Sequence, residues 1–289
     1  MQRFFFAWQY FYPVSTVEGW QYQVIYRHIE KPSALIIDED NNLLVAHELN
    51  RQRGSITRIS PGGNTETVFS QLDKPDGILP LEEGYIFSQE SGKHPLIRVH
   101  NQQTDELFTG VNLQGLTRQG DTLYAVEDRK GDGRLFQYNI HTRELNILRN
   151  SLYESEILAV CPDGSKFYNE KTRGRIRQFT EDGADPVYLS GLNQPSFLRC
   201  DEDGLWISED ATHRARLLLY TPRKELKTIA AFLKAPQHLY KVDEQTYYLA
   251  EQGRNRILKL TRDCSRRSAQ CKQGSPQNET KHTRSAPEI

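Results

Sequence analysis

The sequence lacks several features that would indicate large classes of function. Methionine occurs only at position 1, and the formal net charge is −1 over 289 residues. No broad basic excess is therefore present to bind the phosphates of a nucleic acid. No apolar run approaches the roughly 18 residues that a membrane-spanning helix needs. None of the four cysteines has a second cysteine or a histidine at zinc-like spacing, which argues against metal binding by thiolates.

Aromatic residues, in contrast, are plentiful, with 14 Tyr and 12 Phe. Aromatic and β-branched side chains favour strands over helices. The hydrophobic set makes up 37% of the residues and the charged set 26%. A chain of this length and composition can bury a sizeable core beneath a well-solvated exterior.

The start of the chain and its cysteines leave the cellular compartment open. Residues 1–19 begin with an arginine and a short apolar run, as a signal peptide does, but "WQYFYP" interrupts the run. An aromatic segment packed against the domain explains these residues equally. Cys264 and Cys271 could close a small disulfide loop in an oxidising compartment, and a periplasmic or secreted location is favoured. Cys161 and Cys200 occupy matching places in neighbouring repeats, without necessarily being within bonding reach.

A repeated segment ending in glutamate sets the architecture. It recurs about every forty residues, which is typical of the blades of a β-propeller. The six copies are "LLVAHE" at Glu48, "YIFSQE" at Glu90, "LYAVED" at Glu127, "KFYNEK" at Glu170, "LWISED" at Glu209 and "YYLAEQ" at Glu251. Each copy follows an apolar strand and a polar turn, and precedes an alternating strand and a more polar outer one. The sequence therefore predicts an all-β, six-bladed propeller with four-stranded blades.

The last unit has no fourth strand before the chain becomes polar. The segment "YQVIYRHI", residues 22–29, can supply that strand and close the ring. We therefore expect the propeller to span residues 20–263. The tail, residues 264–289, has almost no large apolar residue and is predicted to be disordered.

The blades resemble the NHL-type repeat and its six-bladed relatives, the gluconolactonase and senescence-marker-protein family and the strictosidine-synthase-like proteins. The resemblance rests on "EQGRNRILKL", "AVCPDGSKFYNEKTRGRIRQF" and "KPDGI", and it covers about the whole domain. The lactonase relationship implies a metal site built from a glutamate, asparagines and an aspartate where the innermost strands begin. Asp76 in "PDGI" matches the aspartate, Glu156 stands where an asparagine is expected, and Gln114 and serines replace the other asparagines.

Polar side chains at the starts of the innermost strands are the candidate site. These entrance positions are Ser33, Asp76, Gln114, Glu156, Ser196 and Gln237, with His238 following. Oxygen donors in a ring suit Ca²⁺, and a bound cation could polarise a lactone or ester carbonyl. We predict Asp76, Glu156, Gln114 and Gln237 as metal ligands, and Glu156 and His238 as catalytic groups. Simpler roles are a turn cap for Asp76, a solvated rim position for Glu156 and packing for His238.

The six repeated glutamates favour a structural role. Arg175 and Arg256 follow Glu170 and Glu251 at short distance, and arginines also follow Glu127 and Glu209. A carboxylate at the end of one strand and a guanidinium at the start of the next can clasp the hairpin between them.

The leading hypothesis is a small-molecule hydrolase of the lactonase or esterase kind, possibly metal-assisted and monomeric, acting at the channel mouth. One alternative is a non-catalytic propeller that binds a small molecule or a protein. Another is a strictosidine-synthase-like enzyme that relies on Glu156 without a metal.

Overall fold

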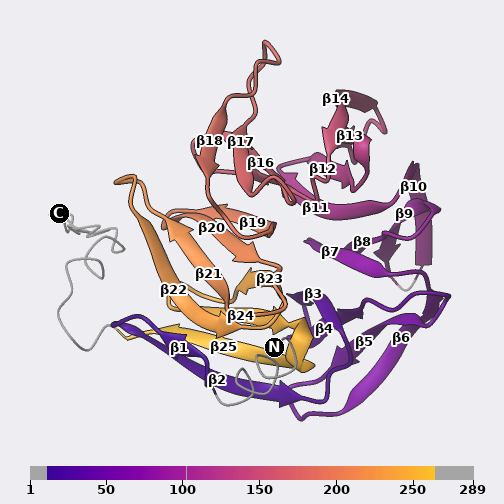
Figure 1. Ribbon diagram of the computed structural model, residues 1–289. Helices are drawn as coiled ribbons and strands as arrows, with labels where there is room; N and C mark the ends of the chain where they lie inside the picture. Colours follow the sequence, from indigo (N-terminus) through magenta and orange to yellow (C-terminus); the bar gives the residue numbers. More distant parts are fainter. Residues whose placement is uncertain (1–11, 102, 264–289) are drawn as a thin grey trace, which may run out of the picture.

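The structure is a ring of six antiparallel β-sheets, which confirms the six-bladed β-propeller (Figure 1). The computed structural model describes residues 12–101 and 103–263. Within these ranges the only helical segment is the short 3-10 turn η1 (Gln252–Arg254). None of their helices is long and apolar enough to cross a membrane. Cys264, Cys271 and the rest of the predicted tail lie outside the described residues.

The first three blades follow one another along the chain, each from the innermost strand to the outermost. Blade 1 consists of β3 (Pro32–Ile37), β4 (Leu43–His47), β5 (Gly54–Ile59) and β6 (Thr65–Leu72). Blade 2 consists of β7 (Pro75–Leu81), β8 (Gly84–Gln89), β9 (Lys93–His100) and β10 (Gln103–Val111). Blade 3 consists of β11 (Leu113–Gln119), β12 (Thr122–Glu127), β13 (Lys130–Asn139) and β14 (Leu145–Tyr153).

The last three blades keep this order but recruit the N-terminal strands. Blade 4 consists of β15 (Leu158–Val160), β16 (Lys166–Glu170), β17 (Arg175–Gln178) and β18 (Val187–Ser190). Blade 5 consists of β19 (Pro195–Asp201), β20 (Gly204–Glu209), β21 (Ala215–Tyr220), β22 (Leu226–Leu233) and β1 (Ser15–Thr16). Blade 6 consists of β23 (Pro236–Lys241), β24 (Thr246–Glu251), β25 (Arg256–Arg262) and β2 (Trp20–Arg27).

The core lies between the blades. Six clusters of buried apolar side chains are present in the described part of the chain, one at each interface between neighbouring blades. The second strands are apolar on both faces because each is covered from two sides. All five residues of β4, for example, are buried. The apolar runs that marked the repeat in the sequence are therefore the walls between blades.

The ring closes as expected from the sequence. Strand β2 pairs antiparallel with β25, from Trp20 opposite Arg262 to Arg27 opposite Arg256. The short β1 continues this closure by pairing with β22, where Thr16 lies opposite Ala230. The N-terminal segment thus contributes to two blades, and the propeller includes residues before position 20. No covalent bond is needed at this seam because backbone pairing joins the two ends of the chain.

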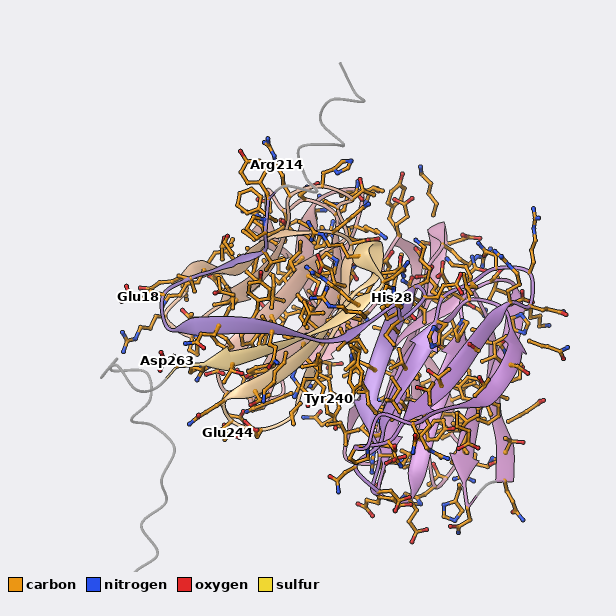
Figure 2. All side chains as sticks on the ribbon, turned by 90° about the horizontal axis from the view of Figure 1, so that it is seen from below. Glu18, His28, Arg214, Tyr240, Glu244 and Asp263 are labelled. Atoms are coloured by element: carbon orange, nitrogen blue, oxygen red, sulfur yellow. A yellow bond between two sulfur atoms is a disulfide. The ribbon has the colours of Figure 1, made fainter. Side chains whose placement is uncertain are left out.

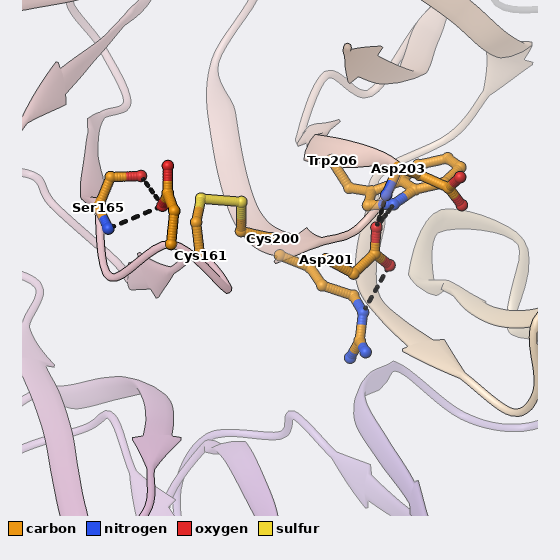
Figure 3. The surroundings of a disulfide bond; sticks show 8 residues. Cys161, Ser165, Cys200, Asp201, Asp203 and Trp206 are labelled. Atoms are coloured by element: carbon orange, nitrogen blue, oxygen red, sulfur yellow. Dashed lines mark hydrogen bonds and ion pairs between the residues drawn. A yellow bond between two sulfur atoms is a disulfide. The ribbon is translucent and has the colours of Figure 1, made fainter. Parts of the chain in front are cut away.

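A disulfide joins blades 4 and 5 (Figure 3). Cys161 lies in the turn after β15 and Cys200 lies near the end of β19, with 4.7 Å between their Cα atoms. The matching positions of the two cysteines in the repeat explain why they meet. The pairing that the sequence left open is therefore formed, and it crosses from one blade to the next.

Candidate functional site

The six strand-entrance residues meet at one cavity. Each blade contributes from the start of its innermost strand, and the lining includes Ser33, Asp76, Gln114, Glu156, Ser196, Gln237 and His238. The cavity has a volume of about 30 Å³, which is the space of about one water molecule. The entrance residues named from the sequence thus line one cavity. A ligand larger than a water molecule or an ion has to bind above this cavity.

A backbone motif repeated in every blade positions these side chains. Two residues before each of them, the chain takes a positive φ between 43° and 54°. The carbonyl group of that residue accepts a hydrogen bond from the residue that follows the second strand. The six acceptor and donor pairs are Lys31 and Glu48, Lys74 and Glu90, Asn112 and Asp128, Glu154 and Lys171, Gln194 and Asp210, and Ala235 and Gln252. The six donors form a second ring beside the entrance residues, which we call the rim ring.

The rim ring corrects the alignment of the repeat in two blades. The innermost strands begin opposite Glu127, Glu209 and Glu251 in blades 3, 5 and 6. In blades 1 and 2 the same place is taken by His47 and Gln89. Placing Glu48 and Glu90 with the other repeated glutamates was therefore wrong by one residue. Glu48 and Glu90 belong to the rim ring together with Asp128, Lys171, Asp210 and Gln252.

The four correctly aligned glutamates clasp their hairpins, as predicted. Glu127 accepts hydrogen bonds from Arg134 at 2.6 and 2.8 Å and from the backbone amide of Val111 at 2.7 Å. Glu209 repeats this arrangement with Arg216 at 2.6 and 2.8 Å. The other two have several arginine partners: Arg173, Arg175 and Arg177 for Glu170, and Arg254 and Arg256 for Glu251. These carboxylates hold turns through charge-assisted hydrogen bonds.

A lysine bridges the acids on one side of the mouth. The ammonium group of Lys74 lies 3.1 Å from Glu48 and 2.5 Å from Glu90. Burial, followed by the charges of Glu48 and Glu90, raises the pKa of Asp76 well above its ordinary value. The Nε2 atom of Gln114 donates to Asp76 at 2.7 Å. Asp76 thus lies in an acidic, water-poor part of the mouth, where its protonated form is favoured.

A second lysine bridges the acids on the other side. The ammonium group of Lys171 lies 2.7 Å from Glu156 and 2.6 Å from Asp210. Burial acts to lower the pKa of Lys171, but the two carboxylates outweigh it and raise this pKa. Gln237 extends the network by donating from Nε2 to Asp210 at 2.8 Å. Lys171 and Asp210 were missed in the sequence because they occupy the rim ring, one residue after the repeated glutamate position.

Glu156 is the most deeply buried acid of this network. Its side chain is 4% exposed, and its backbone amide donates to Oδ1 of Asn169 at 2.9 Å. Burial raises the pKa of Glu156 well above its ordinary value, although Lys171 opposes the shift. The Oε2 atom is buried and has no hydrogen-bond partner within the described residues. A carboxyl group that holds its proton at higher pH and keeps one oxygen uncommitted can act as an acid or a base.

Solved structures with the same fold include enzymes. No protein-family model matches the sequence, and no curated protein matches it. A gluconolactonase from Xanthomonas campestris has a TM-score of 0.69 at 11% identity, over 85% of this chain and 91% of that one. A putative gluconolactonase has a TM-score of 0.66 at 12% identity, over 85% and 93%. Virginiamycin B lyase from Staphylococcus aureus has a TM-score of 0.59 at 12% identity, over 86% and 99%. The chain shares the propeller fold of these proteins.

Oxygen donors gather at the channel mouth. The propeller brings together the carboxylates of Asp76 and Glu156 with the amide of Gln114 around the water-sized cavity. Oε1 of Gln114 and Oε2 of Glu156 are both buried without a hydrogen-bond partner in the described part of the chain. Those ranges hold no cluster of three or more His, Cys, Asp or Glu side chains that could bind a metal. A cation held by Asp76 and Glu156 would therefore also need amide oxygens, and the other oxygen of Glu156 contacts Lys171.

His238 is neutral in the propeller. Burial, followed by the charge of Arg199, lowers the pKa of His238 to about 3. Its ring packs against Phe197 with 4.5 Å between centroids, and its Nδ1 atom has no hydrogen-bond partner within the described residues. A neutral imidazole can accept a proton only weakly when its pKa is this low. Of the two residues predicted to be catalytic, Glu156 has the better environment for proton transfer.

Proposed function

We propose that the protein is a small-molecule hydrolase that opens lactones or cleaves esters at the channel mouth. The observation that supports this most directly is Glu156, a buried carboxyl group with a raised pKa and an uncommitted oxygen. Environments that shift a carboxyl pKa upward are typical of acid–base groups in enzymes. The substrate lies over the rim ring, because the cavity below holds only about one water molecule.

In this proposal Glu156 transfers the proton, and Lys171 holds the carboxylate of Glu156 in position. The ionised carboxylate takes a proton from a water molecule as the water oxygen adds to the substrate carbonyl carbon. The bond to the leaving oxygen then breaks, and Glu156 returns the proton to that oxygen. An ammonium group has three donors, and Lys171 uses two of them for Glu156 and Asp210. The third can stabilise the negative charge that develops on the carbonyl oxygen.

A divalent cation, Ca²⁺ by preference, is part of the same proposal. Asp76, Glu156, Gln114 and Gln237 are the residues that would hold it, through oxygen atoms that a calcium ion prefers. When bound it would polarise the substrate carbonyl. Metal content after purification, and the melting temperature with added calcium or a chelator, test this part without an activity assay. Asp76→Ala should abolish any calcium-dependent rise in melting temperature.

The decisive experiment compares two glutamate variants on a panel of lactones and esters. Glu156→Gln should lower kcat/KM by about 100-fold or more, because it removes the proton acceptor and keeps the shape of the side chain. The matched control is Glu181→Gln, a change in the same blade at a side chain that is 86% exposed. Equal turnover by both variants would disprove the role of Glu156.

The main rival is a non-catalytic binding propeller. The very small cavity and the paired charges around Lys171 and Lys74 favour it, since both are compatible with a site that only holds a ligand. Activity of the wild-type chain on no member of the panel, together with saturable binding of a small molecule, would establish this rival. The proposal also takes the active unit to be a monomer, because one chain completes the ring. Light scattering of the purified protein tests this.

A further inference from the structure

A second cavity lies at the other end of the innermost strands. It has a volume of about 430 Å³, a size typical of small-molecule sites. Strands β11, β19 and β23 begin at the channel mouth and end at this cavity, which we call the lower cavity. Three or four residue steps lead from the entrance residues Gln114, Ser196 and Gln237 to Arg118, Arg199 and Lys241. At about 3.3 Å per residue, these steps span roughly 10–13 Å. Figure 2 shows Arg214, in the loop after β20, and Glu244, which lines the lower cavity, on opposite sides of the molecule.

Two guanidinium groups line the lower cavity with donors to spare. Arg118, at the end of β11, donates from Nε to the carbonyl oxygen of Gly120 at 2.5 Å. Arg199, near the end of β19, has its Nε atom 3.5 Å from Asp201. The terminal nitrogens of both arginines make no hydrogen bond within the described part of the chain. Since arginine stays charged at any physiological pH, each guanidinium can still bind an anion.

Two acids of the lower cavity are committed to the protein itself. Asp201 faces the blade, where its carboxylate accepts a hydrogen bond from Trp206 Nε1 at 3.0 Å (Figure 3). It also accepts one from the Tyr247 hydroxyl at 3.3 Å. Asp243 holds its own turn by accepting from the backbone amide of Gln245 at 2.8 Å. Asp201 also forms an ion pair with Nε of Arg199 at 3.5 Å, which leaves the terminal nitrogens of that guanidinium.

Lys241 and two further carboxylates also line the lower cavity. Glu202 and Glu244 are 74% and 88% exposed, and both contact the ammonium group of Lys241, at 3.3 and 3.1 Å. Exposed pairs of this kind interact weakly and are screened by salt. The lining of the lower cavity therefore mixes both signs of charge, and the terminal guanidinium nitrogens of Arg118 and Arg199 are the donors that remain for an anion. The disulfide between Cys161 and Cys200 also lines it and fixes the strand that presents Arg199.

We propose that the lower cavity binds a small organic anion, held by Arg118 and Arg199 through its carboxylate or phosphate group. Guanidinium groups bind both oxyanions through paired hydrogen bonds. The two arginines come from blades 3 and 5, so the anion bridges across blade 4. This site does not depend on the hydrolase proposal, because none of its residues belongs to the channel mouth.

Calorimetric titration of the full chain tests the lower cavity directly. The probes are citrate for the carboxylate, glucose 6-phosphate for the phosphate, and glucose as the neutral control. The wild-type chain should bind at least one of the two anions and not glucose. Arg118→Gln and Arg199→Gln should each weaken that binding about tenfold, the usual effect of losing one charge-assisted hydrogen-bonding group. The lysine variants at the same positions should restore part of the affinity.

Two controls make the result specific. Arg143→Gln removes a guanidinium from an exposed site in blade 3 and should leave anion binding unchanged. Glu156→Gln should also leave anion binding unchanged. Failure of the hydrolase proposal can then be distinguished from failure of the anion-site proposal. The inference is overturned if neither anion binds at millimolar concentration. It is also overturned if Arg143→Gln weakens anion binding as much as the two cavity variants do. Should Arg199→Gln fail to fold, Arg118→Gln alone decides the question.

Discussion

Single carboxylates in this propeller differ according to the cation that meets them. The carboxylates of Glu127 and Glu209 each accept two hydrogen bonds from one arginine and a further one from a backbone amide. Glu156 and Asp210 share one lysine instead. Because an ammonium group is a point charge and not a planar fork, Lys171 contacts one oxygen of each acid. The Oε2 atom of Glu156 has no hydrogen-bond partner in the described part of the chain, whereas Gln237 donates to the other oxygen of Asp210. The arginine-bound acids hold their hairpin turns, and the hydrolase proposal uses the Oε2 atom of Glu156.

Asp185 provides a test of stability against pH. Burial would raise its pKa, but bonds from Arg149, the Thr180 amide and the Tyr168 hydroxyl outweigh burial and hold this pKa at about 2. A folded-state pKa below the ordinary 3.8 stabilises the fold at higher pH, by about 2 kcal/mol for such a shift. This stability is present above pH 3.8 and is lost as the pH falls toward 2. Asp185→Asn should therefore destabilise the protein at pH 7 and flatten the acid limb of its stability curve.

Urea unfolding between pH 2 and 7 measures the effect of Asp185→Asn. The exposed Asp40→Asn serves as its control and should leave the curve unchanged. If Asp185→Asn lowers the free energy of unfolding no more at pH 7 than at pH 2, the stabilising role of ionised Asp185 is contradicted.

For single residues, the sequence predicted the glutamate–arginine contacts within the hairpins and missed the rim ring. The clasps were predictable because an acid and an arginine a few residues apart must meet across a tight hairpin. The rim ring could not be predicted in this way. In two blades His47 and Gln89 replace the repeated glutamate, so the alignment of the repeats selected the next residues, Glu48 and Glu90. The partners of Lys171 come from two different blades, and no local pattern encodes such a meeting.

Among the strands, β2 has the greatest influence on the integrity of the ring. It is the outer strand of blade 6 although it precedes blade 1 in the chain. Its first residue, Trp20, packs against Trp206 at 5.7 Å and Tyr247 at 5.8 Å between ring centroids, and the guanidinium of Arg262 lies 5.0 Å from its ring. The contact with Trp206 connects blade 6 to blade 5, so Trp20 secures the seam beyond its own sheet.

Trp20→Ala should lower the free energy of unfolding by about 2–3 kcal/mol, since large aromatic truncations in packed sites cost about this much or more. The neighbouring Gln21→Ala serves as the control and should change stability by less than about 0.5 kcal/mol. Chemical denaturation followed by tryptophan fluorescence and circular dichroism measures both. A loss for Trp20→Ala no greater than that of the control would show that β2 does not hold the ring.

The closing strand was predictable because the sixth unit is one strand short and "YQVIYRHI" alternates as an outer strand does. The fifth strand of blade 5, β1, was not. It comprises only Ser15 and Thr16, and a pair of residues has no period to detect. Its position follows from the path of the chain toward β2.

The whole molecule is a ring of six similar interfaces between blades, and its two faces carry different side chains. The channel mouth is lined by acids and two bridging lysines, whereas the lower cavity presents two arginines. The entrance residues and the two arginines come from opposite ends of the innermost strands, and the rim ring adds residues that follow the second strands. The repeat explains why these residues meet, and the differences between the repeats explain why each face has its own chemistry.

The disulfide between blades 4 and 5 gives a prediction for the ring as a whole. It closes a loop with a sequence separation of 39 residues, for which the chain-entropy relation gives a stabilisation of about 4 kcal/mol. A Cys161→Ala/Cys200→Ala double variant should melt roughly 8 °C below the oxidised wild-type chain, and a reducing agent should lower the melting temperature of the wild type but not of the variant. A melting temperature of the wild type that does not respond to reductant would refute this account, provided that thiol titration confirms reduction. Disulfides persist in oxidising compartments, so a large effect would also support the periplasmic or secreted location favoured by the sequence.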